Sequence, residues 1–279
     1  SCNYSSHSNF YLFIVNIFSY MKIREATSFD KISVLKFCKD TFSWGDYIEQ
    51  VWDHWLSEGN LLLFEKQSPI GICHAFFSTG QLWIEGIRID PIFRRQKIAS
   101  KLVKFAESIG QQKDILFSFM LIDIENSSSL LMANSLDYSI SQTWNFYSLL
   151  PQKNSNHNVS FENSLNIQKY PHYVKSWRWL PIDDSILSSF YENDKIIKSN
   201  MDGKISIAIL TDSEHFDKTL IVTLFSGSQN SSSQIISYLQ NYAIENKYER
   251  IQILTKEKLS IFNSLEHKIS FHLMKKTLS

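Results

Sequence analysis

The chain has 279 residues, 43% of them hydrophobic, and its 28 basic residues balance 28 acidic ones to a formal net charge of +0. This length suits one large domain or two of ordinary size, with ample apolar material for a core. Nucleic acid and anionic membranes attract a basic excess, so we expect neither as a partner. Cys2, Cys38 and Cys73 lack paired spacing, which predicts neither a disulfide framework nor a zinc site and fits a reducing cytoplasm.

Residues 1–20 form a separate segment. Its apolar stretch, Phe10 to Phe18, is too short to span a bilayer. It also lacks the basic leader and cleavage site of a secretory signal. We expect the fold to begin at Met21, with residues 1–20 as an N-terminal extension outside it and no stable membrane association. A membrane-touching anchor is the alternative.

From Met21 onward, hydrophobic periodicity predicts alternating strands and helices. The predicted elements are a strand over 21–26, helices from about 28 and over 47–56, strands over 61–66, 70–77 and 82–89, a helix ending at Gly110, a strand over 115–121, a helix over 127–136, and one or two strands ending at Leu150. This order predicts a mixed α/β domain over residues 21–150.

A polar segment over residues 151–174, with prolines near both ends, is predicted to be a linker. Beyond it, the order of elements loosely repeats the first half. The predicted elements are a hairpin around Asp202-Gly203, a strand over 219–227, a helix over 235–246, a strand over 250–255, a helix over 259–267 and a strand over 268–274. We therefore expect a second, smaller α/β domain over residues 175–279.

The segment WIEGIRIDPIFRRQKIAS, residues 83–100, places positive charges between a strand and an amphipathic helix. The first turn of a helix has backbone N–H groups without partners and the positive end of the dipole. A diphosphate there would satisfy several donors, and Arg94, Arg95 and Lys97 would add charge-assisted hydrogen bonds. The alternative is a helix start whose charges are solvated surface groups.

Within this segment, I-x-I-D-P-x-x-R-R-x-K-I-A resembles the acyl-CoA loop of the GNAT acetyltransferases, usually V-x-P-x-x-[QR]-G-x-G-x-[GA]. Arg94 falls on the Gln/Arg position, and Arg95 and Lys97 stand where glycine is common. Downstream, NSSSLLMANSLDY resembles the family's N-x-x-A-x-x-x-Y-x-x-x-G-F helix, with Ala133 at the tyrosine position. The W-x-E-G-x-R stretch further resembles a subgroup that includes amino-acid, notably histidine, N-acetyltransferases.

The resemblance covers residues 21–150 and returns, degraded, over 175–279. It implies a tandem of GNAT folds, each a mixed central sheet flanked by helices, with acetyl-CoA as co-substrate and no metal. In the family, the strand before the loop splays from its neighbour and binds the pantetheine arm, while the loop holds the pyrophosphate. The cofactor contacts so implied are Ile87, Arg88, Ile89, Arg94, Arg95, Gln96, Lys97, Ile98, Ala99, Ser100 and Asn126. Lys97 is compatible with this role if its φ is helical, and Asn126 could instead be a helix N-cap.

Acetylation of an amine needs a neutral nucleophile, whereas an alkyl amine of pKa ~10 is mostly protonated at neutral pH. A carboxylate, directly or through water, is the usual helper. Strand alternation predicts that Glu85 shares a face with Ile87 and Ile89, so Glu85 is the leading candidate for the general base. A salt-bridged glutamate is the alternative. Trp83, beside Glu85, is a candidate wall of the substrate pocket.

In the family, a helix tyrosine commonly meets the leaving thiolate, but Ala133 has no hydroxyl. We expect Tyr138 or a water to substitute, and a thiol of pKa ~8.5 also leaves as an anion. Cys73 and His74 are adjacent on a strand and face opposite ways, so His74 is expected to be structural.

In the second half, SGSQNSSSQ stands where the loop would be, without its arginines or glycine pattern, and is not expected to bind CoA. That half is expected to cover or support the acceptor groove. The sequence thus predicts a cytoplasmic N-acetyltransferase, monomer or homodimer, that moves an acetyl group directly to a primary amine. A small amine or amino acid is the first expected acceptor, and a peptide is the next. A non-catalytic acyl-CoA-binding or regulatory module and a purely structural α/β pair are the alternatives.

Overall fold

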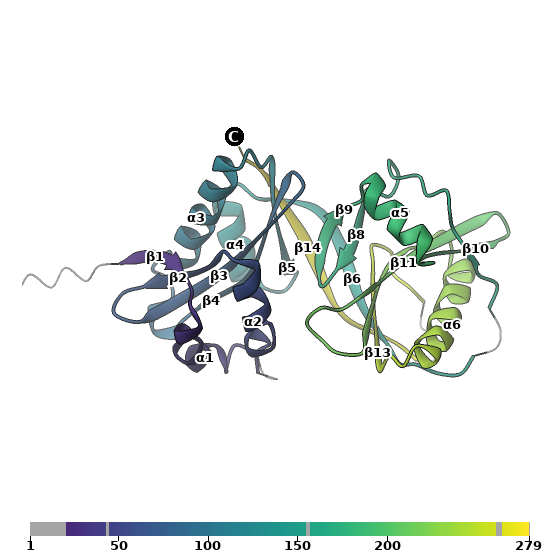
Figure 1. Ribbon diagram of the computed structural model, residues 1–279, viewed down its shortest axis with the longest axis horizontal. Helices are drawn as coiled ribbons and strands as arrows, with labels where there is room; N and C mark the ends of the chain where they lie inside the picture. The colour runs from purple at the N-terminus through teal and green to yellow at the C-terminus, as the bar shows by residue number, and fades with distance from the viewer. Residues whose placement is uncertain (1–20, 43–44, 155–156, 261–263, 279) are drawn as a thin grey trace, which may run out of the picture.

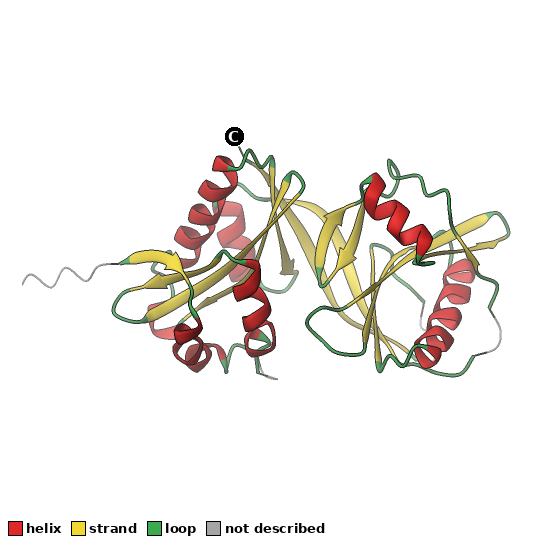
Figure 2. Cartoon of the chain, in the orientation of Figure 1, coloured by secondary structure: helices red, strands yellow, loops and turns green. Residues whose placement is uncertain are grey.

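The computed structural model of the chain describes residues 21–42, 45–154, 157–260 and 264–278 (Figures 1 and 2). The predicted extension over residues 1–20 lies outside these ranges. Within them, no helix is both long and apolar enough to cross a membrane.

The first half of the chain alternates strands and helices in the predicted order. Its elements are β1 (Lys22–Glu25), η1 (Ser28–Asp30), α1 (Lys31–Cys38), α2 (Ile48–Glu58), β2 (Leu61–Glu65), β3 (Pro69–Ser78), β4 (Gln81–Ile89), η2 (Pro91–Phe93), α3 (Ile98–Gln112), β5 (Phe117–Asp123), α4 (Ser127–Ser135) and β6 (Ser139–Leu149). The closing segment, predicted as one or two strands, is the single long strand β6.

The second half repeats part of this order. Its elements are β7 (Ser160–Phe161), β8 (His172–Lys175), β9 (Arg178–Pro181), α5 (Asp184–Glu192), β10 (Ile196–Met201), β11 (Lys204–Asp212), β12 (Thr219–Phe225), α6 (Gln229–Glu245), β13 (Arg250–Thr255) and β14 (Leu265–Thr277). The predicted hairpin at Asp202-Gly203 is confirmed as β10–β11. The short strand β7 and the start of β8 fall in the segment predicted to be a linker.

Twelve strands form one continuous sheet in the order β1-β2-β3-β4-β5-β14-β6-β13-β12-β11-β10-β7, while β8 and β9 pair separately. Most neighbouring pairs are antiparallel, but β4–β5 and β12–β13 are parallel. The sheet is therefore mixed. A helix connects the two strands of each parallel pair, α3 in the first half and α6 in the second, and these helices flank the sheet. The predicted mixed α/β class is confirmed.

The two halves share the central strands β6 and β14 (Figure 1). The last strand, β14, pairs with β5 and so completes the sheet of the first half. The strand β6 belongs to the first half in sequence, yet it pairs with β13 of the second half as well as with β14. Hydrogen bonding therefore interleaves the halves, and each contributes a strand to the sheet of the other.

Helices cover both faces of the first-half sheet. The helix α3 buries Leu102, Val103 and Ala106 on one face, as the predicted helical spacing requires. On the opposite face, α1 and α2 bury Val34 and Trp55, among others. These two cores fix β3 and β4 between helices, which is the region where the sequence motifs converge.

A third core joins the halves. It is aromatic: Trp83 of β4, Trp144 of β6 and Trp179 of β9 are all buried together. The ring of Trp83 stacks on Trp179 at 5.8 Å between centroids, and Trp144 meets Trp179 edge-on at 5.3 Å. Rings of this size exclude water over a large area, so the β8–β9 hairpin is fixed against the first half.

One predicted element is wrong. Residues 259–267 were expected to form a helix, but β14 begins at Leu265, which pairs with Leu149 of β6, and residues 261–263 lie outside the described ranges. Tertiary pairing with the long strand β6 outweighs the local helical spacing. The helix α5 and the β8–β9 hairpin were not predicted.

Candidate active site

The strands β4 and β5 separate after their first residues. They pair only from Gln81↔Phe117 to Trp83↔Phe119, although β4 continues to Ile89 and β5 to Asp123. The strand β5 pairs with β14 along its whole length, whereas beyond this point β4 has β3 as its only neighbouring strand among the described residues. The expected splay is therefore present. It leaves backbone polar groups of β4 without a neighbouring strand over the residues that include Ile87, Arg88 and Ile89.

A β-bulge at Gly86 changes which residues face the splay. The pairing between β3 and β4 shifts register between Ile72↔Arg88 and His74↔Glu85, and Gly86 has φ +64°. A Cβ at Gly86 would lie 2.4 Å from ring atoms of Trp55, so the bulge requires glycine. The expectation that Glu85 shares a face with Ile87 is wrong, because the extra residue in the bulge inverts the alternation.

The two faces that result have different chemistry. Ile87 and Ile89 pack on the α3 side with Ile98 and Leu102. Glu85 lies on the α2 side, where it meets His74, whose ring stacks on Trp55 at 4.8 Å. A ligand arm along β4 and a group acting from Glu85 would thus approach the strand from opposite faces.

The loop after β4 has the backbone of a glycine loop without the glycines. Asp90 begins the turn η2 by accepting a hydrogen bond from the N–H of Ile92 at 3.0 Å. Farther on, Arg95 has φ +62° and Lys97 has φ +59°, both in the left-handed region. Lys97 was expected to be compatible with the cofactor role if its φ were helical, and this condition is not met. A non-glycine residue in that region costs about 1 kcal/mol or more, so the fold supports this shape at the expense of local strain.

The loop presents donors and positive charge. The side chains of Arg94, Arg95, Gln96 and Lys97 are exposed, whereas Ile98 is buried and anchors the helix. In the described part of the chain, no acceptor meets the N–H groups of Ile98, Ala99 and Ser100 in the first turn of α3. These amides and the positive end of the helix dipole are suited to an anion.

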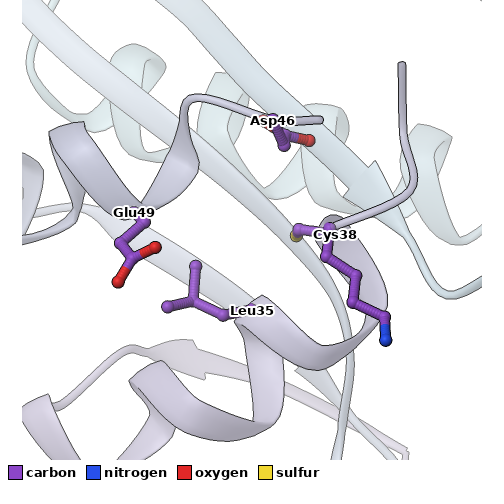
Figure 3. Close-up of a pocket in the computed structure, with 5 residues that line it drawn as sticks. Leu35, Cys38, Asp46 and Glu49 are labelled. Carbon is purple, nitrogen blue, oxygen red and sulfur yellow. The ribbon is translucent and has the colours of Figure 1, made fainter. Parts of the chain in front are cut away.

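Arg88 reinforces the same strand end from the α1–α2 side. Its guanidinium donates to Asp46 at 2.6 Å and 3.1 Å and lies 5.1 Å from the ring of Tyr47. Asp46 also lines a small cavity of about 140 Å³ with Leu35, Cys38, Lys39 and Glu49 (Figure 3). Burial, then the charge of Asp46, raises the pKa of the Cys38 thiol to about 12. Cys38 is therefore a protonated wall residue rather than a nucleophile.

Glu85 lies in a buried cluster of charged side chains. His74 donates through Nδ1 to Glu85 at 2.8 Å, and its Nε2 faces the carbonyl of Gly59 at 3.2 Å. Arg178, from β9, donates to Glu85 Oε1 from Nε at 3.0 Å and from Nη2 at 2.5 Å. It also donates in parallel to both oxygens of Glu58, each at 2.7 Å.

This cluster keeps both carboxylates ionised. Burial raises the pKa of Glu85, but the His74 hydrogen bond and the Arg178 charge outweigh it, and the net pKa is lowered. The pKa of Glu58 is also lowered, because the bonds and charge of Arg178 exceed the effect of burial. Glu85 is thus salt-bridged, the alternative that the sequence left open, and it is stably charged at neutral pH.

The remaining predicted residues are more deeply packed than expected. Tyr138 is buried, and its hydroxyl donates to Glu107 at 2.8 Å and contacts Ser118 Oγ at 2.6 Å. Ser118 pairs with Leu82 at the closed end of the two strands. Burial and the Glu107 charge raise the pKa of Tyr138. This placement does not support a proton-donor role for Tyr138.

Trp83 and Asn126 have structural partners. Trp83 is 1% exposed and stacks on Trp179, so it forms part of the core between the halves. Asn126 caps α4 by accepting the N–H of Ser129 at 3.1 Å. Ala133, at the position of the family tyrosine, is fully buried.

Two groups of side chains could supply metal ligands among the described residues. One comprises His54, Glu58 and Glu214, and the other Glu58, His74 and Glu85. In both, cations already balance the carboxylates, since Arg178 pairs with Glu58 and Glu85, and Lys175 pairs with Glu214 at 2.6 Å. The prediction of a metal-independent site remains a prediction.

The sequence analysis missed Arg178 and Glu58. Arg178 lies within S-W-R-W-L, where two tryptophans flank an arginine immediately after the segment predicted to be a linker. Alternation of large apolar and charged residues is typical of a half-buried strand. That signal was present, but it could not indicate which half the strand would contact.

An open strand edge beside the N-terminus of a helix offers hydrogen bonds to an extended ligand that ends in phosphates. Residues 29–133 match the family model described as the acetyltransferase (GNAT) family. The matched segment lies within the first half of the chain, so that half is similar to the GNAT acetyltransferases. Acyl transfer from acetyl-CoA is the general activity of that family.

Solved structures match across both halves. A candidate acetyltransferase of Thermoplasma acidophilum is 14% identical with a TM-score of 0.62, covering 92% of this chain and 99% of its own. A GCN5-related N-acetyltransferase of Sphaerobacter thermophilus is 10% identical with the same TM-score, covering 92% and 96%. A candidate acetyltransferase of Pyrococcus horikoshii is 17% identical with a TM-score of 0.57, covering 99% and 93%. These similarities are in fold. No curated protein matches the chain.

Proposed function

We propose that the chain transfers an acetyl group from acetyl-CoA to a primary amine at the opening between β4 and β5. The observation that carries this proposal is the end of β4–β5 pairing after Trp83↔Phe119, next to the loop that leads into α3. An unpaired strand edge offers hydrogen bonds to an amide-containing arm, and the adjacent helix start offers donors to phosphates. Both features lie on one continuous path.

The residues present fit acetyl-CoA. Ile87, Arg88 and Ile89 would hold the arm through their backbone, and the amides from Gln96 to Ser100 would hold the diphosphate. The positive φ of Arg95 and Lys97 turns this part of the loop as glycines would. When bound, acetyl-CoA supplies an activated acetyl group as a thioester. Arg94, Arg95 and Lys97 would add positive charge near its phosphates.

On the other face of β4, Glu85 would act on the acceptor. Its carboxylate is ionised, so it can accept a hydrogen bond from the incoming amine directly or through one water. A carboxylate with a lowered pKa does not retain the amine's proton, and it would pass that proton to solvent. In this proposal Glu85 orients the amine and relays its proton to solvent. The bulge at Gly86 sets the direction in which the Glu85 side chain points.

Direct attack, without an acyl-enzyme, agrees with the state of the described cysteines. Burial raises the pKa of both Cys38 and Cys73, so neither presents a thiolate. With Ala133 at the family tyrosine position and the Tyr138 proton donated to Glu107, protonation of the departing thiolate is assigned to solvent. A small amine or amino acid remains our first choice of acceptor and a peptide the second.

The second candidate is a non-catalytic acyl-CoA-binding or regulatory module. One observation favours it: the carboxylate of Glu85, the proposed catalytic group, is already paired with Arg178 and His74. It predicts the same CoA affinity but no transfer.

One experiment separates these functions. CoA binding is measured by calorimetry, and thiol release from acetyl-CoA is followed with a panel of amines. We expect binding and amine-dependent release, and Glu85→Gln should lower kcat by about 100-fold with unchanged CoA affinity. Glu65→Gln is the matched control. It alters a carboxylate on β2 that pairs with Arg24 of β1, away from the opening, and should retain kcat. Binding without release by any amine would establish the module. Absence of binding would leave only a structural role.

A further inference from the structure

The arginine in the charged cluster comes from the second half of the chain, outside the residues that match the family model. Arg178 is 2% exposed, begins β9 and makes ion pairs with Glu58 of α2 and Glu85 of β4. Its guanidinium also lies 4.0 Å from the ring centroid of Phe76. Five contacts from three elements of the first half therefore surround one side chain from the second.

The hairpin that carries Arg178 is held by both halves. On the first-half side, Gln81 Nε2 donates to the carbonyl of Trp179 at 2.7 Å. On the second-half side, the N–H of Val174 donates to Thr223 Oγ1, and Thr211 Oγ1 donates to the carbonyl of Val174, each at 2.8 Å. Movement of the second half would therefore move Arg178 relative to Glu85.

The turn that precedes Arg178 is strained. Ser176 has φ +49° and Trp177 has φ +65°, and neither is glycine. Two central residues with positive φ make the tight hairpin turn that matches strand twist, usually at Asn-Gly. Trp177 is retained in this geometry by packing and by a 2.9 Å hydrogen bond from its Nε1 to Gln252. Such strain persists only where the surroundings impose it, and here it fixes the direction of β9.

We infer that Arg178 is a positioning residue for the proposed acetyl transfer: its guanidinium fixes the Glu85 carboxylate beside the β4 bulge. This inference rests on the proposed function and assigns a role to the second half. The loop and splay can bind the co-substrate, but the acceptor side is completed only when β9 docks.

The titratable and charged groups that interact with Glu85 support this role. They come from α2, β3, β9, the segment before α2 and the loop between β11 and β12, and they are Tyr47, Glu58, Cys73, His74, Arg178 and His215. Burial lowers the pKa of His215 to about 4, so His215 is neutral at physiological pH. His74 and Arg178 thus act as the donors to Glu85. Both also lie near Glu58, but Arg178 is closer to it, at 2.7 Å against 3.6 Å for His74.

The test compares Arg178→Gln and Arg178→Lys with the unaltered full-length chain. For each, kcat/KM is measured from pH 5 to 9, and CoA affinity is measured by calorimetry. Without the guanidinium, the pKa of Glu85 rises, so the acid limb of the profile for Arg178→Gln should move up by about 1 to 3 pH units. Its kcat should fall by about 100-fold through misplacement, with CoA affinity unchanged. Arg178→Lys should recover part of both effects.

The matched control is Lys276→Gln. Lys276 makes another ion pair across the halves, from β14 to Glu107 of α3 at 2.8 Å, but away from Glu85. The Lys276→Gln variant should be less stable than the unaltered chain, but the pH profile of its kcat/KM should not move.

Three outcomes are decisive. An unaltered chain that releases no thiol overturns the proposed function and this role with it. An active chain whose Arg178→Gln profile keeps its acid limb overturns this inference alone. If Arg178→Gln does not fold, Arg178→Lys serves as the test. An unmoved acid limb and full kcat in Arg178→Lys would overturn the inference and leave Arg178 only a packing role.

Discussion

The start of α3 and the start of α6 occupy corresponding places in the two halves, but the parallel strands beside them pair differently. In the first half, β4 and β5 pair over three residues and then separate. In the second, the parallel strands β12 and β13 pair along their whole length, from Thr219↔Arg250 to Leu224↔Thr255. A closed ladder satisfies the backbone groups that a ligand arm would need.

The helix N-termini differ in the same way. At α6, Ser228 caps the helix by accepting the N–H of Ser231 at 3.1 Å, and Ser206 and Ser232 extend a buried network of hydroxyls. Gly227 crosses so close to β11 that a Cβ there would lie 2.1 Å from the carbonyl oxygen of Ile205. The same secondary-structure order thus produces an open donor site in one half and an internally satisfied junction in the other. This contrast supports the expectation that the second half does not bind CoA.

The largest expected effect comes from filling the bulge that opens the first half. Gly86→Ala would place a Cβ 2.4 Å from the Trp55 ring and force a left-handed φ on alanine. We expect a loss of about 3 kcal/mol in the free energy of unfolding, measured by urea denaturation, and at least a tenfold loss of CoA affinity. The matched control is Gly203→Ala in the second half, where φ is also positive but the space is open. It should cost about 1 kcal/mol and leave CoA binding intact. Equal effects from both variants would contradict a special role for the bulge.

The next effect is on acid stability. Arg24 donates a hydrogen bond to Asp30, and this bond and those from Thr27 outweigh burial and lower the pKa of Asp30 from its usual 3.8 to about 2. The native pKa is lowered, so this stabilisation is present above pH 4 and is lost as pH falls toward 2, by about 2 kcal/mol. In Arg24→Gln, the unfolding free energy should be lower at pH 7 and should decline less between pH 4 and 2. Lys198→Gln, which removes the cation paired with Glu162 in the second half, should have the smaller effect. A parallel pH dependence in Arg24→Gln and the unaltered chain would exclude Asp30 as its source.

The fold was largely predictable because its signal is local. Helical spacing of Ile98, Leu102 and Ala106 and the apolar runs of the strands determine where elements form, and these residues are buried as expected. The sharing of β6 and β14 was not predictable, since strand order in a sheet depends on contacts between residues far apart in sequence. The predicted helix over 259–267 failed for the same reason.

The site was predictable on one face of β4 only. The loop motif indicated the residues from Ile87 to Ser100, and the splay and positive φ angles agree with it. The other face depends on a bulge at Gly86 and on Arg178 from beyond the linker. Neither the W-x-E-G-x-R stretch nor the S-W-R-W-L alternation indicates which side chains these two residues bring together. Alternation assigned Glu85 to the wrong face because one inserted residue reverses every later side chain.

A smaller effect is expected from the exposed charges of the open site. Arg94→Gln with Arg95→Gln removes two cations beside the first turn of α3, and we expect about a tenfold loss of CoA affinity at low salt. Calorimetry at low and high ionic strength checks the cause, since the difference between variant and unaltered chain should shrink as salt screens the charges. Lys256→Gln with Lys258→Gln, beyond the corresponding edge of the second half, is the control and should change nothing. A salt-independent loss would indicate damage to the loop backbone instead.

The smallest effect concerns the helix caps. Asn126→Ala removes the cap of α4, and Ser228→Ala removes that of α6, so each should cost about 1 kcal/mol in urea denaturation. Asn126→Asp keeps an oxygen that can accept the N–H of Ser129, and we expect both its stability and its CoA affinity to match those of the unaltered chain. Asn126 was also predicted to contact the cofactor through its amide. Only Asn126→Asp tests that contact, because it removes the amide but keeps the helix cap. A stable Asn126→Asp variant with weakened CoA binding would restore the cofactor role, while Ser228→Ala should leave binding unchanged, because α6 starts in the closed half.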